Sequence, residues 1–75
     1  MIVWKYAKRI AEVISTRYRD KLPFTLIRNL ELAVETMNED QFIMELYFAV
    51  RTLHVHYNII DRELLELIDK AIKLP

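Results

Sequence analysis

Glycine and cysteine are both absent from this 75-residue chain, and proline occurs only at Pro23 and Pro75. Without glycine the chain cannot easily form tight hairpins or loops that cradle a phosphate, whereas helices lose nothing. Without cysteine it has neither disulfides nor thiolate metal sites. Its two histidines are too few for most metal sites unless carboxylates assist them. We therefore expect neither a metal nor a cofactor.

Long apolar runs are absent as well. The longest, residues 46–50, is much shorter than the ~18–20 residues of a membrane-spanning helix. The apolar start, residues 1–4, is interrupted by Lys5 and has no preceding basic segment, so it does not have the form of a secretory signal. The sequence predicts no membrane association and, by default, a cytoplasmic location.

Apolar residues recur at helical spacing in four segments. The pattern predicts helices from Ile2 to about Arg19, from about Pro23 to Met37, from Asn38 to about Tyr57, and from about Arg62 to Leu74. The links between them are short, which favours antiparallel neighbours. We expect an all-α fold in one domain, residues 1–75, arranged as an antiparallel up-and-down four-helix bundle.

Two of the predicted helix starts carry capping signals. Asn38 is a good N-cap with Gln41 three residues later, and Asp61 is an N-cap with Glu63 in the first turn. The segment 58–61 is the softest boundary, and one continuous bent helix over the last two segments is the alternative. Arg17 is the one charged residue within the apolar face of the first helix.

The third segment is apolar nearly all round, so it is either central in the bundle or faces another subunit. Its broad predicted core face consists of Phe42, Ile43, Leu46, Tyr47, Ala49, Val50, Leu53 and Tyr57. A second stripe on the same helix consists of Met44, Phe48 and Val55.

The chain has more apolar side chains than four regular stripes bury, including Phe24 at the start of the second helix. A core of this size is marginal, and exposed apolar patches usually mark partner surfaces. We therefore expect a homodimer. The predicted interface consists of Trp4, Leu32, Met44, Phe48 and Val55. The alternative for Met44, Phe48 and Val55 is an ordinary place in the core of a central helix.

Charge is unevenly distributed although the net charge is zero. Residues 1–28 contain seven basic and two acidic side chains, and residues 29–75 contain four basic and nine acidic ones. The basic face of the first helix is a candidate nucleic-acid-binding surface, with Lys5, Lys8, Arg9 and Arg19 as its residues. The alternative is a solvated face that complements acidic side chains on the other helices.

The string RTLHVHY places Arg51, His54, His56 and Tyr57 close together in the sequence. Arginine holds a phosphate and histidine transfers a proton near neutral pH, so this pair suits metal-free RNA cleavage by the 2′-hydroxyl. On a regular helix, residues five apart point about 140° away from each other. Arg51 and His56 converge only if the helix breaks near His56 or a second copy supplies one of them.

The segment 51–72 resembles HEPN domains, which are helical-bundle, metal-independent ribonucleases. Their signature is an arginine, four to six residues, and then a histidine, a spacing that Arg51 and His56 match. The resemblance implies a catalytic set of Arg51, His56 and Tyr57. Thr52 departs from the pattern, because a more polar residue usually follows the arginine.

Three classes of function follow from these observations. The leading one is a non-enzymatic helical interaction module that acts through a self-associating apolar surface. The alternatives are nucleic-acid binding through the first helix and HEPN-like RNA cleavage. No glycine loop, carboxylate dyad or nucleophile–base pair indicates another enzyme class.

Overall fold

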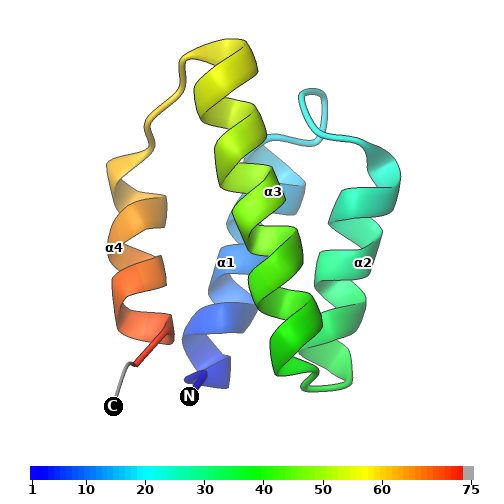
Figure 1. Cartoon of the computed structure of the whole chain (residues 1–75), viewed down its shortest axis with the longest axis vertical. Helices are drawn as coiled ribbons and strands as arrows, with labels where there is room; N and C mark the ends of the chain where they lie inside the picture. The colour runs from blue at the N-terminus through cyan, green and yellow to red at the C-terminus, as the bar shows by residue number, and fades with distance from the viewer. Residues whose placement is uncertain (74–75) are drawn as a thin grey trace.

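The computed structural model describes residues 1–73, which contain four helices: α1 (Trp4–Arg17), α2 (Phe24–Glu35), α3 (Glu39–Tyr57) and α4 (Arg62–Ala71) (Figure 1). The prediction of an all-helical chain with four helices is confirmed. The alternative of one continuous helix over α3 and α4 is wrong, because Asn58 takes a left-handed conformation with φ 54° and ends α3.

The helices do not enclose the core evenly. Helix α1 packs against both α2 and α4, and α2 packs against α3. Helices α3 and α4 follow each other in the chain, yet none of their Cα atoms come within 8 Å of each other. Figure 1 shows α3 in front of α1, with α2 and α4 on opposite sides. The α3–α4 side of the molecule is therefore the side that backbone packing leaves open.

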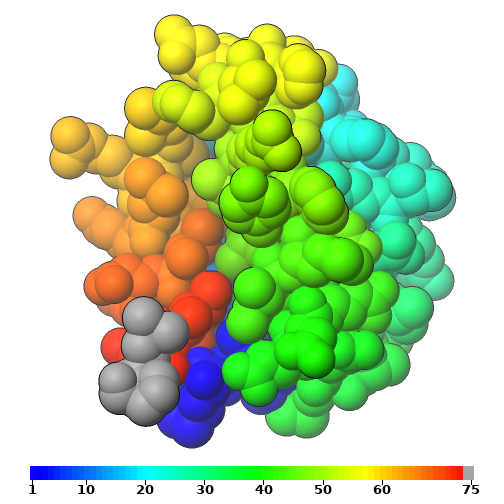
Figure 2. All heavy atoms as spheres, in the orientation of Figure 1, coloured from blue at the N-terminus to red at the C-terminus, as the bar shows by residue number. Residues whose placement is uncertain are grey.

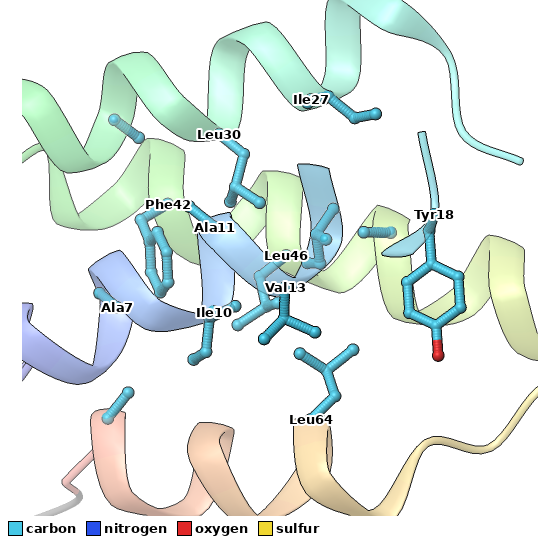
Figure 3. Packing of buried hydrophobic residues seen from close by; sticks show 14 of the residues in the cluster. Ala7, Ile10, Ala11, Val13, Tyr18, Ile27, Leu30, Phe42, Leu46 and Leu64 are labelled. Atoms are coloured by element: carbon cyan, nitrogen blue, oxygen red, sulfur yellow. The ribbon is translucent and has the colours of Figure 1, made fainter. Parts of the chain in front are cut away.

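The core lies among all four helices, each of which contributes buried side chains (Figure 3). Its largest fully buried side chains are Ile10, Ile14, Leu30, Phe42 and Leu53. The ring of Phe42 meets that of Trp4 edge to face, with ring centroids 5.8 Å apart.

Both ends of the predicted helix pattern require correction, because α1 begins at Trp4 and α4 ends at Ala71. Ile2 is extended instead and forms an antiparallel bridge with Ile72, supported by a 2.7 Å bond from Val3 N–H to the Ala71 carbonyl. Burial of Ile2 accompanies this pairing. Leu74, the expected end of the fourth helix, lies outside the described residues.

Helices α1 and α2 are also shorter than the pattern predicts at the ends where they meet turns. Helix α1 ends at Arg17 rather than Arg19, and α2 spans Phe24–Glu35. The N–H of Leu22 bonds to the Tyr18 carbonyl at 3.2 Å, and Leu22 is buried, so the intervening residues form a turn that folds back on the core.

The helix starts agree with the capping signals. The Asn38 side chain accepts a 3.1 Å hydrogen bond from Gln41 N–H, and the Asp61 side chain accepts one of 3.1 Å from Leu64 N–H. Since the chain has no glycine, Met37 takes the left-handed position after α2, with φ 52°. The next residue, Asn38, therefore follows the end of α2 and caps the start of α3.

Replacement of Asn38 by alanine should lower the free energy of unfolding by about 1 kcal/mol, because the first turn of α3 loses its side-chain acceptor. Urea unfolding followed by circular dichroism measures the change. Asn38→Ser is the control, because serine caps as well as asparagine. Equal losses for both variants would contradict a capping role.

Candidate interaction surface on helix α3

The outer side of α3 exposes large apolar side chains because the core takes only one edge of this helix. The buried edge follows a spacing of four, three and four residues, through Phe42, Leu46, Ala49 and Leu53. At ~100° per residue, these positions cover a narrow arc of the helix. The prediction of a broad core face on α3 is wrong at Ile43, Tyr47 and Tyr57, which are all exposed.

The outer stripe consists of Met44, Phe48 and Val55, which are 50%, 43% and 61% exposed. The alternative that placed these three residues in the core is wrong. Together with Arg51 they repeat the spacing of four, three and four residues on the opposite side of the helix. Spacing of this kind is the one that lets side chains of two paired helices interlock.

An aromatic pair widens the outer stripe. The rings of Tyr47 and Phe48 meet edge to face, with centroids 5.7 Å apart. In the space-filling view, α3 in green and yellow crosses the centre of the front of the molecule (Figure 2). The exposed apolar side chains thus gather on one helix, whereas single exposed apolar residues are common on any protein.

The other predicted interface residues lie elsewhere. Trp4 is half-buried against Phe42, and Leu32 lies on α2 with 42% of its surface exposed. Phe24 is the most exposed of the larger apolar residues, at the start of α2 and away from α3.

A groove runs between α3 and α4 where the two helices stay apart. It consists of two hollows with volumes of about 260 and 390 Å³. Both hollows are lined by Val50, His54 and Leu65, so they are parts of one groove. Sequence analysis missed this feature, because its walls were assigned to closed core faces.

The structure places the residues of the predicted catalytic set on different sides of α3. The helix is continuous through Tyr57, so Arg51 and His56 point about 140° apart within one chain. Arg51 and His54 both line the groove, whereas His56 does not. The Lys21 ammonium lies 5.5 Å from the ring centroid of Tyr57. Arg51 and His56 can therefore meet only if a second copy of the chain supplies one of them.

The predicted basic face of α1 is interrupted by acidic neighbours. Lys8 lines a cleft between α1 and α2 that also contains Arg28 and three glutamates, Glu12, Glu31 and Glu35. Lys5 lies 5.1 Å from the ring centroid of Tyr6, and Arg19 donates to the Ser15 carbonyl at 3.3 Å. Arg9 is exposed. These placements agree better with a solvated face than with a uniform phosphate-binding surface.

Asp61 is the junction that positions α4. One carboxylate oxygen caps α4, and the other accepts hydrogen bonds from the Tyr18 hydroxyl and from Arg17, whose nitrogen lies 2.7 Å away. A second nitrogen of Arg17 binds Glu63 at 2.8 Å. In Figure 3 the Tyr18 hydroxyl points from the end of α1 toward the segment that leads into α4. Arg17, the misfit in the apolar face, thus joins two helices.

The environment of this junction shifts the pKa values of Asp61 and Tyr18. Burial by itself raises the pKa of Asp61, but the hydrogen bonds from Tyr18, Arg17 and Leu64 N–H outweigh it, and the net pKa is lowered. Burial and the hydrogen bond to Asp61 raise the pKa of Tyr18. The ionised carboxylate and the neutral phenol are therefore the forms that the folded chain favours.

No known protein family, curated protein or solved structure matches this chain. Among the helices of residues 1–73, none combines the length and the apolarity needed to cross a membrane. The same residues bring no three acidic or histidine side chains together in a metal-binding arrangement.

Acid should weaken the fold through Asp61. Its lowered pKa contributes stability that is complete above the unfolded value of 3.8 and is lost as pH falls below it. In Asp61→Asn, the free energy of unfolding should be lower at pH 7 and should decrease less between pH 5 and pH 2 (roughly the range over which such a carboxylate titrates). Urea unfolding at several pH values measures both effects.

Tyr18→Phe serves as the graded control for this prediction, because it removes one donor to Asp61 and keeps the cap. Its acid dependence should fall between those of the natural protein and Asp61→Asn. An Asp61→Asn variant with the full acid dependence of the natural protein would show that other carboxylates control it.

Proposed function

We propose that this chain is a non-enzymatic helical interaction module, an antiparallel up-and-down bundle that forms a homodimer through the outer stripe of α3. The observation that carries the proposal is the exposure of Met44, Phe48 and Val55 at interlocking spacing on one helix. Burial of each such side chain is worth about 1.5–3 kcal/mol at full coverage. A second helix laid along the stripe covers all of them together.

A second copy fits this surface because α3 is complementary to itself. Its first turn carries Glu39 and Asp40, and its last turns carry Arg51, His54 and His56. Antiparallel pairing brings the acidic start of each α3 near the basic end of the other, and it also opposes the two helix dipoles. Parallel pairing would place like charges together. The charges therefore favour an isologous antiparallel pair.

The midpoint of the outer stripe defines the register of this pair. The stripe is centred between residues 49 and 50, so a two-fold axis there places Met44 opposite Val55 of the partner subunit. It also places Arg51 opposite Phe48 of the partner subunit, where a guanidinium stacks on an aromatic face. The single charged position of the stripe therefore has a partner in the dimer.

The same register determines how far Arg51 lies from His56 of the partner subunit, and RNA cleavage would need these two residues close together. It places His56 of the partner subunit opposite Ile43, eight residues and about 12 Å along the helix from Arg51. A composite Arg51–His56 site needs a different register, centred between residues 53 and 54. The proposed pairing therefore supports an interaction module rather than a ribonuclease.

Met44→Asp should convert the dimer to a monomer, because each new carboxylate would face Val55 of the partner subunit in an apolar contact without a cationic partner. Sedimentation equilibrium measures the mass, and circular dichroism checks that helix content is kept. The natural protein should dimerise over the same concentration range.

Phe24→Asp is the matched control, since Phe24 is 78% exposed but lies outside α3. This variant should remain dimeric. A natural protein that stays monomeric at high concentration would contradict the proposal, as would dissociation by Phe24→Asp but not by Met44→Asp.

A further inference from the structure

The groove between α3 and α4 borders the outer stripe and shares Arg51 with it. Its larger hollow is walled by apolar side chains of both helices, including Ile43, Leu46, Ile68 and Ile72. Around the axis of α3, the groove positions Val50 and His54 lie about 100° from the outer stripe. Arg51 and Tyr47 belong to both surfaces, and the other groove residues lie outside the stripe.

Two basic side chains, Arg51 and His54, line this groove. Arg51 and His54 are three residues apart, so they lie on neighbouring positions of one helix side. Among residues 1–73, neither forms a salt bridge or a side-chain hydrogen bond. The groove also includes Asp61, but Arg17 and Tyr18 already bind that carboxylate. The free polar groups at the groove thus suit an anion.

The size of the hollows limits what enters them. A helix about 10 Å across and 15 Å long occupies on the order of 1,000 Å³, several times the larger hollow of about 390 Å³. From Arg51 the apolar lining continues along α3 to Ile43, eight residues or about 12 Å away. A narrow, extended apolar chain fits this shape, whereas a helix would remain mostly outside it.

We propose that the α3–α4 groove binds a single-chain amphiphile with a carboxylate head, of the medium-chain fatty acid class. The carboxylate lies between Arg51 and His54, where a guanidinium makes paired hydrogen bonds to both oxygens. The alkyl chain extends along the apolar walls toward Ile43 and Ile72. Arg51 is common to this proposal and to the proposed dimer: the face of its guanidinium stacks on Phe48 of the partner subunit, and its N–H edge remains free for a carboxylate.

Isothermal titration with decanoate, below its micelle-forming concentration, tests the groove. The natural protein should bind decanoate at one site per chain. Decanol and decyltrimethylammonium should bind at least about tenfold more weakly, because they lack the charge that Arg51 recognises. Comparable affinity for the cationic amphiphile would overturn the proposal.

Substitutions of groove residues test where decanoate binds. Arg51→Gln and His54→Gln should each weaken decanoate binding, and Leu65→Trp should abolish it by filling the groove. Arg62→Gln is the control, because Arg62 is exposed on α4 and does not line either hollow. Unchanged binding in Arg51→Gln, or equal weakening in Arg62→Gln, would overturn the assignment of the head group.

The monomeric variant separates this proposal from the dimer. Met44→Asp should bind decanoate like the natural protein, whatever its association state, because Met44 lines neither hollow. If Leu65→Trp or decanoate dissociates the dimer, the groove is part of the subunit contact and the proposal is overturned. If decanoate binds while the natural protein is monomeric, only the proposed function fails.

Discussion

The junction at Asp61 determines how the rest of the molecule is arranged. One carboxylate caps α4 and binds both Arg17 and Tyr18 at the end of α1. Helix α4 is therefore held against α1 rather than against α3, its neighbour in the chain. The break at Asn58 permits this, because a left-handed residue lets the chain leave the axis of α3.

The position of α4 leaves α3 only partly covered. One edge of α3 packs into the core through Phe42 and Leu53, while its outer stripe and the side facing α4 stay accessible. A helix with three different sides gives this small domain a core, a surface for a second copy and a groove for an apolar chain. Both the proposed dimer surface and the proposed ligand groove are accessible because α4 does not pack against α3.

The sequence predicted the four helices and both caps well, because helical periodicity and capping are local properties. It also identified Met44, Phe48 and Val55 as a second stripe on α3, but it left open whether that stripe lies in the core. It did not predict that Ile43 and Tyr47 are exposed, since their spacing also suits a core face and only the placement of α4 decides between the two. Arg17 was the visible signal of the Asp61 junction, because a charge inside an apolar face requires a partner from elsewhere in the fold.

Cysteine cross-linking tests the central claim most directly, since the natural chain has no cysteine to interfere. In the antiparallel register Met44 of each subunit faces Val55 of the other. A double variant, Met44→Cys with Val55→Cys, should oxidise to a covalent dimer, whereas either single variant should stay uncross-linked. Efficient cross-linking of the Met44→Cys variant alone would indicate parallel pairing, and no cross-linking of the double variant would contradict association through this stripe.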